Sequence, residues 1–236
     1  SVKDYSKLYL MQDKFLPFMH NLGLPFYLTG GTALGRFYLN HRYSEDLDFF
    51  VNADPLYQGY IGELKKEITA CFKVDIKQAL FAQDFTRFFI EEDGMILKIE
   101  FINDVSYRPD KTEVYTYGKI DTPLNILSNK LTAIVSRDEP KDVFDIIHIS
   151  KAYSFNWKDV FYHAKQKAAI NEIDIEQRLV SFPVKLLESV HLINPTVNYD
   201  STKNGLRQIA DDFLLGKDNS QGNGKKPIET AKPWNG

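Results

Sequence analysis

Two hydrophobic periods alternate along the first half of the chain. Apolar residues three and four positions apart predict amphipathic helices over Tyr5–Leu22 and Tyr60–Phe72. Alternation with period two, or a short apolar run between turn residues, predicts strands, because successive side chains of a strand point to opposite faces. The strands predicted in this way are Phe26–Leu28, Asp46–Phe49, Val74–Phe81, Thr86–Glu91, Met95–Ile102 and Val114–Tyr117.

Beyond Pro123 only helical spacing remains. One predicted helix begins near Pro140, with Asp138 as its cap. The other predicted helices are Leu124–Ser136, Trp157–Lys165, Ile175–Leu187 and Leu206–Leu215. Residues 216–236 hold almost nothing apolar, which predicts a flexible tail. The pattern as a whole predicts an α+β protein, with a mixed sheet flanked by helices in residues 1–122, a helical subdomain in residues 123–215, and the tail.

Composition narrows the class of protein. The 236 residues are 43% hydrophobic, enough for a sizeable core. A net charge of −3 excludes a generally basic nucleic-acid coat, so any RNA or DNA contact must come from a local patch. No apolar run approaches the roughly twenty residues of a membrane span, and charged residues occur throughout the first twenty, so we expect a cytoplasmic protein. The single Cys71 is expected to be a buried thiol.

Candidate chemistry gathers between the first two predicted strands. Gly30-Gly31-Thr32 joins a strand to a short helix, and such a turn leaves main-chain N–H groups free to bind a phosphate. Asp46 and Asp48 flank Leu47 and therefore share one strand face. Two like charges this close repel each other unless a cation lies between them, and Mg²⁺ is the first choice for oxygen ligands.

A second set of charged residues lies on the predicted helices. At about 100° per residue, Lys130 falls inside the apolar arc of its helix, where a lysine requires an anion. Asp142 and Asp145 are three residues apart on the next helix and share a face. Apolar residues surround Asp145 in the sequence, so a merely solvated role is not expected for it.

These stretches resemble a known signature. Gly-Gly-Thr, thirteen residues and then Asp46-Leu47-Asp48-Phe49 is similar to the pattern of the DNA polymerase β-type nucleotidyltransferase superfamily. The longer stretches Gly30–Leu34 and His41–Phe49 resemble the AbiEii/AbiGii toxin family of nucleotidyltransferases, and Lys130–Asp145 resembles the C-terminal motif of the same family. The resemblance implies a polymerase β-like nucleotidyltransferase fold with a C-terminal helical subdomain.

The resemblance also implies the site residues. The metal ligands would be Asp46, Asp48 and Glu100. The phosphates of a nucleoside triphosphate would lie against Gly30, Gly31, Thr32 and Lys130. The catalytic set would be Asp46, Asp48, Glu100, Lys130 and Asp142. Glu100 is the candidate third carboxylate because it alternates with Ile99 and Phe101 along the strand and therefore points away from the core.

Two structural alternatives stay open at this point. Glu100 could be a surface residue paired with Lys98 on the same strand face, and Asp104 is a weaker substitute for it as the third carboxylate. The second alternative is a buried ion network that holds the two helices together. Its members would be Lys130, Arg137, Asp142 and Asp145.

The activity implied by the resemblance is transfer of a nucleoside monophosphate from an NTP to an acceptor hydroxyl, with Mg²⁺ as the cofactor. The acceptor would be an RNA such as tRNA, and the protein would be the toxin of a bacterial toxin–antitoxin or phage-defence pair, restrained by an antitoxin protein. A small-molecule acceptor, as in aminoglycoside-modifying relatives, is the alternative enzyme. Nucleotidylation of a protein and a non-catalytic module that binds nucleotide or partner are further alternatives.

Overall fold

A mixed sheet forms the centre of the protein. The computed structural model describes residues 3–193 and 197–234. Within these residues the sheet has seven strands in the order β3-β4-β5-β2-β1-β7-β6, in which β2 is parallel to β5 and β1 is parallel to β7. The strands are β1 (Tyr27–Thr29), β2 (Leu47–Asn52), β3 (Leu80–Phe81), β4 (Phe85–Glu92), β5 (Met95–Asp104), β6 (Glu113–Tyr115) and β7 (Gly118–Ile120). The predicted α+β architecture with a mixed sheet is therefore confirmed.

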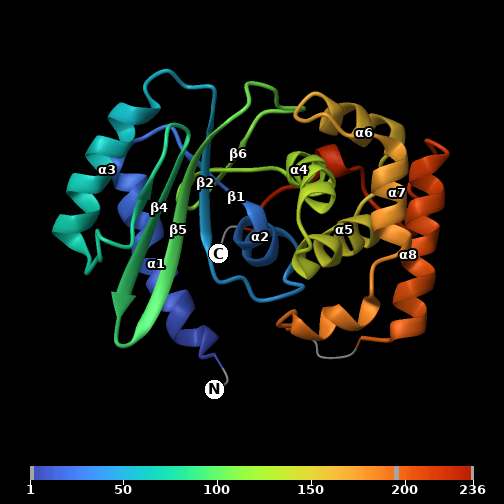
Figure 1. Ribbon diagram of the computed structural model, residues 1–236, viewed down its shortest axis with the longest axis horizontal. Coiled ribbons are helices and arrows are strands. Elements are labelled where there is room, and N and C mark those ends of the chain that lie inside the picture. Colours follow the sequence, from blue (N-terminus) through green and yellow to red (C-terminus); the bar gives the residue numbers. More distant parts are fainter. Residues whose placement is uncertain (1–2, 194–196, 235–236) are drawn as a thin grey trace.

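Two helices cover the apolar face of the sheet. They are α1 (Tyr5–Leu22), which passes behind β4 and β5 in Figure 1, and α3 (Tyr57–Cys71), which lies to the left of the strands. The ring centroids of Phe15 on α1 and Phe49 on β2 are 6.0 Å apart. The Tyr57 hydroxyl donates to the main-chain carbonyl of Phe101 at 2.7 Å. Leu47, Phe49 and Phe101 are almost fully buried on this face, as the alternation in the sequence predicts.

The glycine segment is itself helical. The helix α2 (Gly30–Leu34) begins directly after β1, and a π-helix, η1 (Gly35–Leu39), continues it. We predicted a turn that leads into a helix, whereas Gly30 and Gly31 form the first residues of the helix. Gly30 makes the sharp change of direction possible, because its φ of 70° lies in the left-handed region that favours glycine.

The C-terminal helices lie on the other side of the sheet, to the right of the strands in Figure 1. They are α4 (Pro123–Ser136), α5 (Pro140–Ala152), α6 (Trp157–Lys165), α7 (Glu172–Val180) and α8 (Tyr199–Leu214). Two details differ from the predictions. Glu139 rather than Asp138 is the cap residue of α5, and the predicted helix 175–187 is divided into α7 and the 3₁₀ helix η2 (Val184–Ser189). Pro183 lies at this division and cannot continue the hydrogen bonds of α7.

The C-terminal segment is not a flexible tail. Residues 216–234 pack against the helical part and contain the 3₁₀ helices η3 (Ser220–Gly222) and η4 (Ile228–Thr230). Ile228 and Ala231 are buried, and the Ile228 N–H donates to the Ser154 carbonyl at 3.0 Å. The Trp234 N–H donates to the Phe37 carbonyl at 2.8 Å. Main-chain hydrogen bonds hold the segment, and its polar composition could not reveal them.

Two smaller predictions, a strand and a buried thiol, were wrong. Only Leu80–Phe81 of the predicted strand Val74–Phe81 forms a strand, and Cys71 is exposed rather than buried. Within the described residues, no helix is both long and apolar enough to cross a membrane. We keep the predicted domain division as a proposal, because α4 begins at Pro123 and no strand follows it in the described part of the chain.

Candidate active site

Three carboxylates lie close together on the sheet face opposite α1 and α3. Asp48 on β2 and Glu100 on β5 are register partners in adjacent parallel strands. Asp46 lies one residue before β2, so it belongs to the loop that enters the strand rather than to the strand itself. Ile99 and Phe101 are fully buried on the core face, which confirms that Glu100 points away from the core.

A lysine lies between two of these carboxylates. The Lys98 Nζ atom is 3.1 Å from Asp46 Oδ2 and 3.3 Å from Glu100 Oε1. Burial alone would lower the pKa of Lys98, but Asp46 and Glu100 raise it above its usual value. Arg87 on β4 also donates to Glu100, from Nη2 at 3.1 Å. The pairing of Glu100 with Lys98, left open from the sequence, is therefore confirmed.

Among the residues that the structure describes, no cationic side chain forms an ion pair with Asp48. Burial, together with the negative charges of Glu100 and Asp46, raises its pKa to about 7. Lys130 and Lys98 act on this pKa in the opposite direction, so both lie near enough to Asp48 for their charges to matter. A carboxylate in this environment favours the approach of a further cation.

The donor set fits an oxygen-preferring divalent ion such as Mg²⁺, since carboxylate oxygens are its usual protein ligands. In the described part of the chain, no three or more His, Cys, Asp or Glu side chains are arranged to hold a metal. The Lys98 ammonium lies between Asp46 and Glu100 and pairs with both of them. The assignment of Asp46, Asp48 and Glu100 as ligands stays a prediction.

The glycine segment is packed directly against these residues. A Cβ atom built on Gly30 would lie 2.6 Å from Asp48 Oδ2, and one built on Gly31 would collide with the Arg42 guanidinium. The Thr32 side chain is fully buried, and its hydroxyl donates to the Asp46 carbonyl and lies 2.9 Å from Ser44 Oγ. This hydrogen bond fastens the helix to the loop that carries Asp46, and the contact of Thr32 with phosphate stays a prediction.

Gly30→Ala is expected to destabilise the protein by about 1–3 kcal/mol, from the left-handed backbone and the contact with Asp48 together. Gly23→Ala is the matched control, because Gly23 has a φ of 66° but no atom within 4 Å of a built Cβ. Urea denaturation measures both variants. Equal losses of unfolding free energy would contradict the close packing of Gly30 on Asp48.

A buried ion network joins α4, α5 and the loop after η1. Lys130 Nζ lies 2.7 Å from Asp142 Oδ1 and 3.0 Å from Asp145 Oδ2. Arg137 donates to both oxygens of Asp142 at 2.7 and 3.0 Å. Arg42 donates to both oxygens of Asp145 at 2.7 and 2.8 Å. The ion network left open from the sequence is therefore confirmed, and it is larger than predicted.

Arg42 and His41 are the members that the sequence did not assign. His41 Nε2 lies 2.7 Å from Asp145 Oδ1, and both side chains are buried. They precede the loop that carries Asp46 and lie in an irregular segment, where no periodicity indicates which way a side chain points. The only sign of their importance in the sequence was their place in the stretch His41–Phe49, which resembles the family signature. The Arg42 guanidinium also lies against Gly31, so Arg42 packs on the glycine segment of the site.

The network carries more positive than negative charge. Burial lowers the pKa of His41, so the ring is neutral near pH 7. Burial alone would raise the pKa of Asp145, but Arg42 and Lys130 hold it well below its usual value. Three cations, Arg42, Lys130 and Arg137, thus face the two carboxylates. Lys130 is the member of this network whose charge lowers the pKa of Asp48, so the network lies beside the carboxylates.

The chain is similar to known proteins in sequence and in fold. The model of the family described as "Nucleotidyl transferase AbiEii toxin, Type IV TA system" matches residues 19–218. No curated protein matches the sequence. The solved structure of JHP933 from Helicobacter pylori is similar, with a TM-score of 0.58 and 22% identity over 91% of this chain and 94% of that one. MenT4, a nucleotidyltransferase toxin from Mycobacterium tuberculosis H37Rv, is similar with a TM-score of 0.55 and 13% identity over 89% of this chain and 84% of its own.

Proposed function

The chain belongs to the AbiEii family of nucleotidyltransferase toxins, and on this premise we propose that it transfers a nucleoside monophosphate from an NTP to a hydroxyl group of an RNA such as tRNA. The observation that carries the proposal is the register pair Asp48 and Glu100, set between the glycine helix and the cationic network. The proposal includes an antitoxin protein as partner and a cytoplasmic location, where NTP and RNA are available.

The triphosphate would bind where positive groups and free main-chain donors meet. The first N–H groups of α2, at Gly30 and Gly31, have no partner within the helix and suit the outer phosphates. Lys130 has two of its three donor directions directed at Asp142 and Asp145, which leaves one for a phosphate oxygen. Asp142 keeps the role of orienting Lys130 and Arg137.

The transfer step needs no nucleophilic side chain. The acceptor oxygen forms a bond to the α-phosphorus, the bond from that phosphorus to the bridging oxygen breaks, and pyrophosphate leaves. Mg²⁺ held by Asp46, Asp48 and Glu100 would supply the charge that the phosphoryl group requires. Glu100 would take the proton of the acceptor hydroxyl, which requires release of its contacts with Lys98 and Arg87.

The test is incubation of the protein with each labelled NTP, Mg²⁺ and total cellular RNA, followed by separation of RNA, protein and small molecules. Label on RNA supports the proposal and identifies the nucleotide. Label on a small molecule or on a protein would support one of the alternative acceptors instead. NTP binding without transfer to any fraction would favour the non-catalytic module.

Glu100→Gln is expected to lower the rate of transfer by about 10²–10³-fold, because the amide neither binds a cation well nor accepts the hydroxyl proton. Asp104→Asn is the matched control. Asp104 is also on β5, four residues further along the same strand face, and it is not paired with Asp48. We expect near-normal transfer from this control in the same labelled-NTP assay. A larger loss for Asp104→Asn than for Glu100→Gln would reverse the choice of the third carboxylate.

A further inference from the structure

A row of apolar side chains lies beside the carboxylates on the same sheet face. Phe85 on β4 pairs with Ile102 on β5, and Ile102 pairs with Phe50 on β2. Each residue is two positions along its strand from Arg87, Glu100 or Asp48, which are themselves register partners across the same three strands. We call Phe50, Phe85 and Ile102 the apolar row. Its three side chains lie next to one another across three adjacent strands.

The apolar row is outside the core. All three members are half-buried, whereas Phe49, Phe88 and Phe101 on the opposite face are almost fully buried. Isolated apolar residues at a surface are common and require no explanation. A continuous row across three strands, next to charged residues, is different because such patches mark binding sites.

The spacing limits what the apolar row can bind. Two residues along a strand correspond to about 7 Å, so any ligand on the row lies about that far from Asp48 and Glu100. A reacting hydroxyl and the base of the same nucleotide are separated by a similar distance. On the basis of the proposed function, we propose that the apolar row binds the terminal nucleobase of the RNA acceptor, by stacking of the base on Phe50 and Phe85.

The order of groups across the sheet favours the acceptor over the NTP. The phosphate-binding glycines follow β1, Asp48 is on β2, Glu100 is on β5 and Arg87 is on β4. Tyr27 on β1 lies beside Phe50 with ring centroids 6.2 Å apart, but it is buried. The half-buried side chains of the apolar row therefore extend over β2, β5 and β4, away from the glycines and towards the side of Glu100. The base therefore belongs to the nucleotide whose hydroxyl meets Glu100, which is the acceptor.

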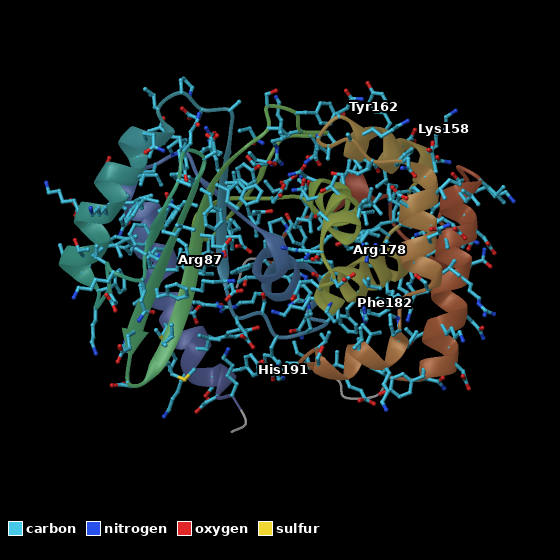
Figure 2. All side chains as sticks on the ribbon, in the orientation of Figure 1. Arg87, Lys158, Tyr162, Arg178, Phe182 and His191 are labelled. Atoms are coloured by element: carbon cyan, nitrogen blue, oxygen red, sulfur yellow. The ribbon has the colours of Figure 1, made fainter. Side chains whose placement is uncertain are left out.

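Two cations lie beside the row, and both are paired with Glu100, whose proposed role in transfer requires release of these contacts. The Arg87 guanidinium lies 5.1 Å from the Phe85 ring centroid, and in the view of Figure 2 Arg87 lies between the β4–β5 strand pair and α2. Lys98 lies on the same sheet face. Aromatic side chains with adjacent cations are the usual means by which proteins hold single-stranded RNA. Stacking tolerates any base, so the row would set the position of the RNA end rather than its sequence.

The experiment compares two RNA probes on wild type and variants. The probes are a short single-stranded RNA with a fluorescent 5′ end, and the same RNA with an abasic 3′-terminal nucleotide; fluorescence anisotropy gives the Kd. Wild type should bind the intact RNA about 5- to 100-fold more tightly than the abasic one. Phe50→Ala and Phe85→Ala should lose this preference while their affinity for NTP stays unchanged. Phe81→Ala, an exposed aromatic position on the edge strand β3, is the matched control and should retain the preference.

Several outcomes would overturn the inference. If wild type binds the two probes with equal affinity, the terminal base is not bound by the row. This comparison uses wild-type protein alone, so it does not depend on whether a variant folds. Weaker NTP binding by Phe50→Ala, with RNA binding intact, would assign the row to the incoming nucleotide. If the variants lose affinity for RNA and for NTP equally, and their Tm is lowered, the row has a structural role. Failure of the proposed function is seen separately, as absence of nucleotide transfer by wild type.

Discussion

Asp48→Asn is expected to reduce nucleotidyl transfer by about 10³-fold or more while leaving the fold intact. Asp48 is the centre of the proposed site, since it pairs with Glu100, contacts Gly30 and lies near Lys130. The amide has nearly the same shape but lacks the charge that would hold a divalent cation. Removal of one of three neighbouring negative charges should leave the free energy of unfolding unchanged or slightly raised.

The labelled-NTP assay and urea denaturation, performed on the same preparation, check this prediction. Asp104→Asn again serves as the control for loss of a carboxylate on this sheet face. If Asp48→Asn keeps more than about a tenth of the wild-type rate, Asp48 is not a metal ligand in catalysis. If the rate falls only because the variant unfolds, the denaturation curve will show it.

Asp145→Asn is expected to lower the free energy of unfolding by about 3–5 kcal/mol. Asp145 is fully buried and accepts hydrogen bonds from Arg42 at 2.7 and 2.8 Å, and the Lys130 ammonium lies 3.0 Å from it. Asparagine would leave the buried Arg42 guanidinium without its counter-charge and Lys130 with Asp142 alone, and removal of one partner is the costly way to break a buried ion pair. Transfer should also decline, because Arg42 supports Gly31 and Lys130 is proposed to bind phosphate.

The stability difference between wild type and Asp145→Asn depends on pH in the direction set by the shifted pKa of Asp145. The pKa of Asp145 is held well below its usual value, so its stabilising contribution is complete above the ordinary carboxyl pKa of about 4 and is lost only as the pH falls further. Wild type and Asp145→Asn should therefore differ fully at pH 7 and converge in acid. Asp138→Asn, which breaks an exposed pair with Arg178, is the control and should change stability little. A small difference between Asp145→Asn and wild type at pH 7 would contradict a stabilising role of the network.

The elements with strong periodicity were predictable because their signal is local. A strand alternates its side chains, so the placement of Glu100 and Asp48 on one face followed from Ile99 and Phe101 and from Leu47 and Phe49. The helical arc that buries Lys130 likewise predicted that it needs an anion, and the structure supplies Asp142 and Asp145. The glycine and aspartate motifs, at their spacing, indicated the family that the comparison shows.

Only the tertiary structure decided which side chains meet across long stretches of chain. Arg42 and Asp145 are 103 residues apart, and neither periodicity nor charge in the sequence pairs them. The same holds for the Thr32 hydroxyl, which is buried against Asp46, and for Ile228, which is buried although its neighbours predict a flexible tail. Local sequence determines which face of an element a side chain lies on. The packing of elements against one another determines what that face contacts, and that packing is a property of the whole chain.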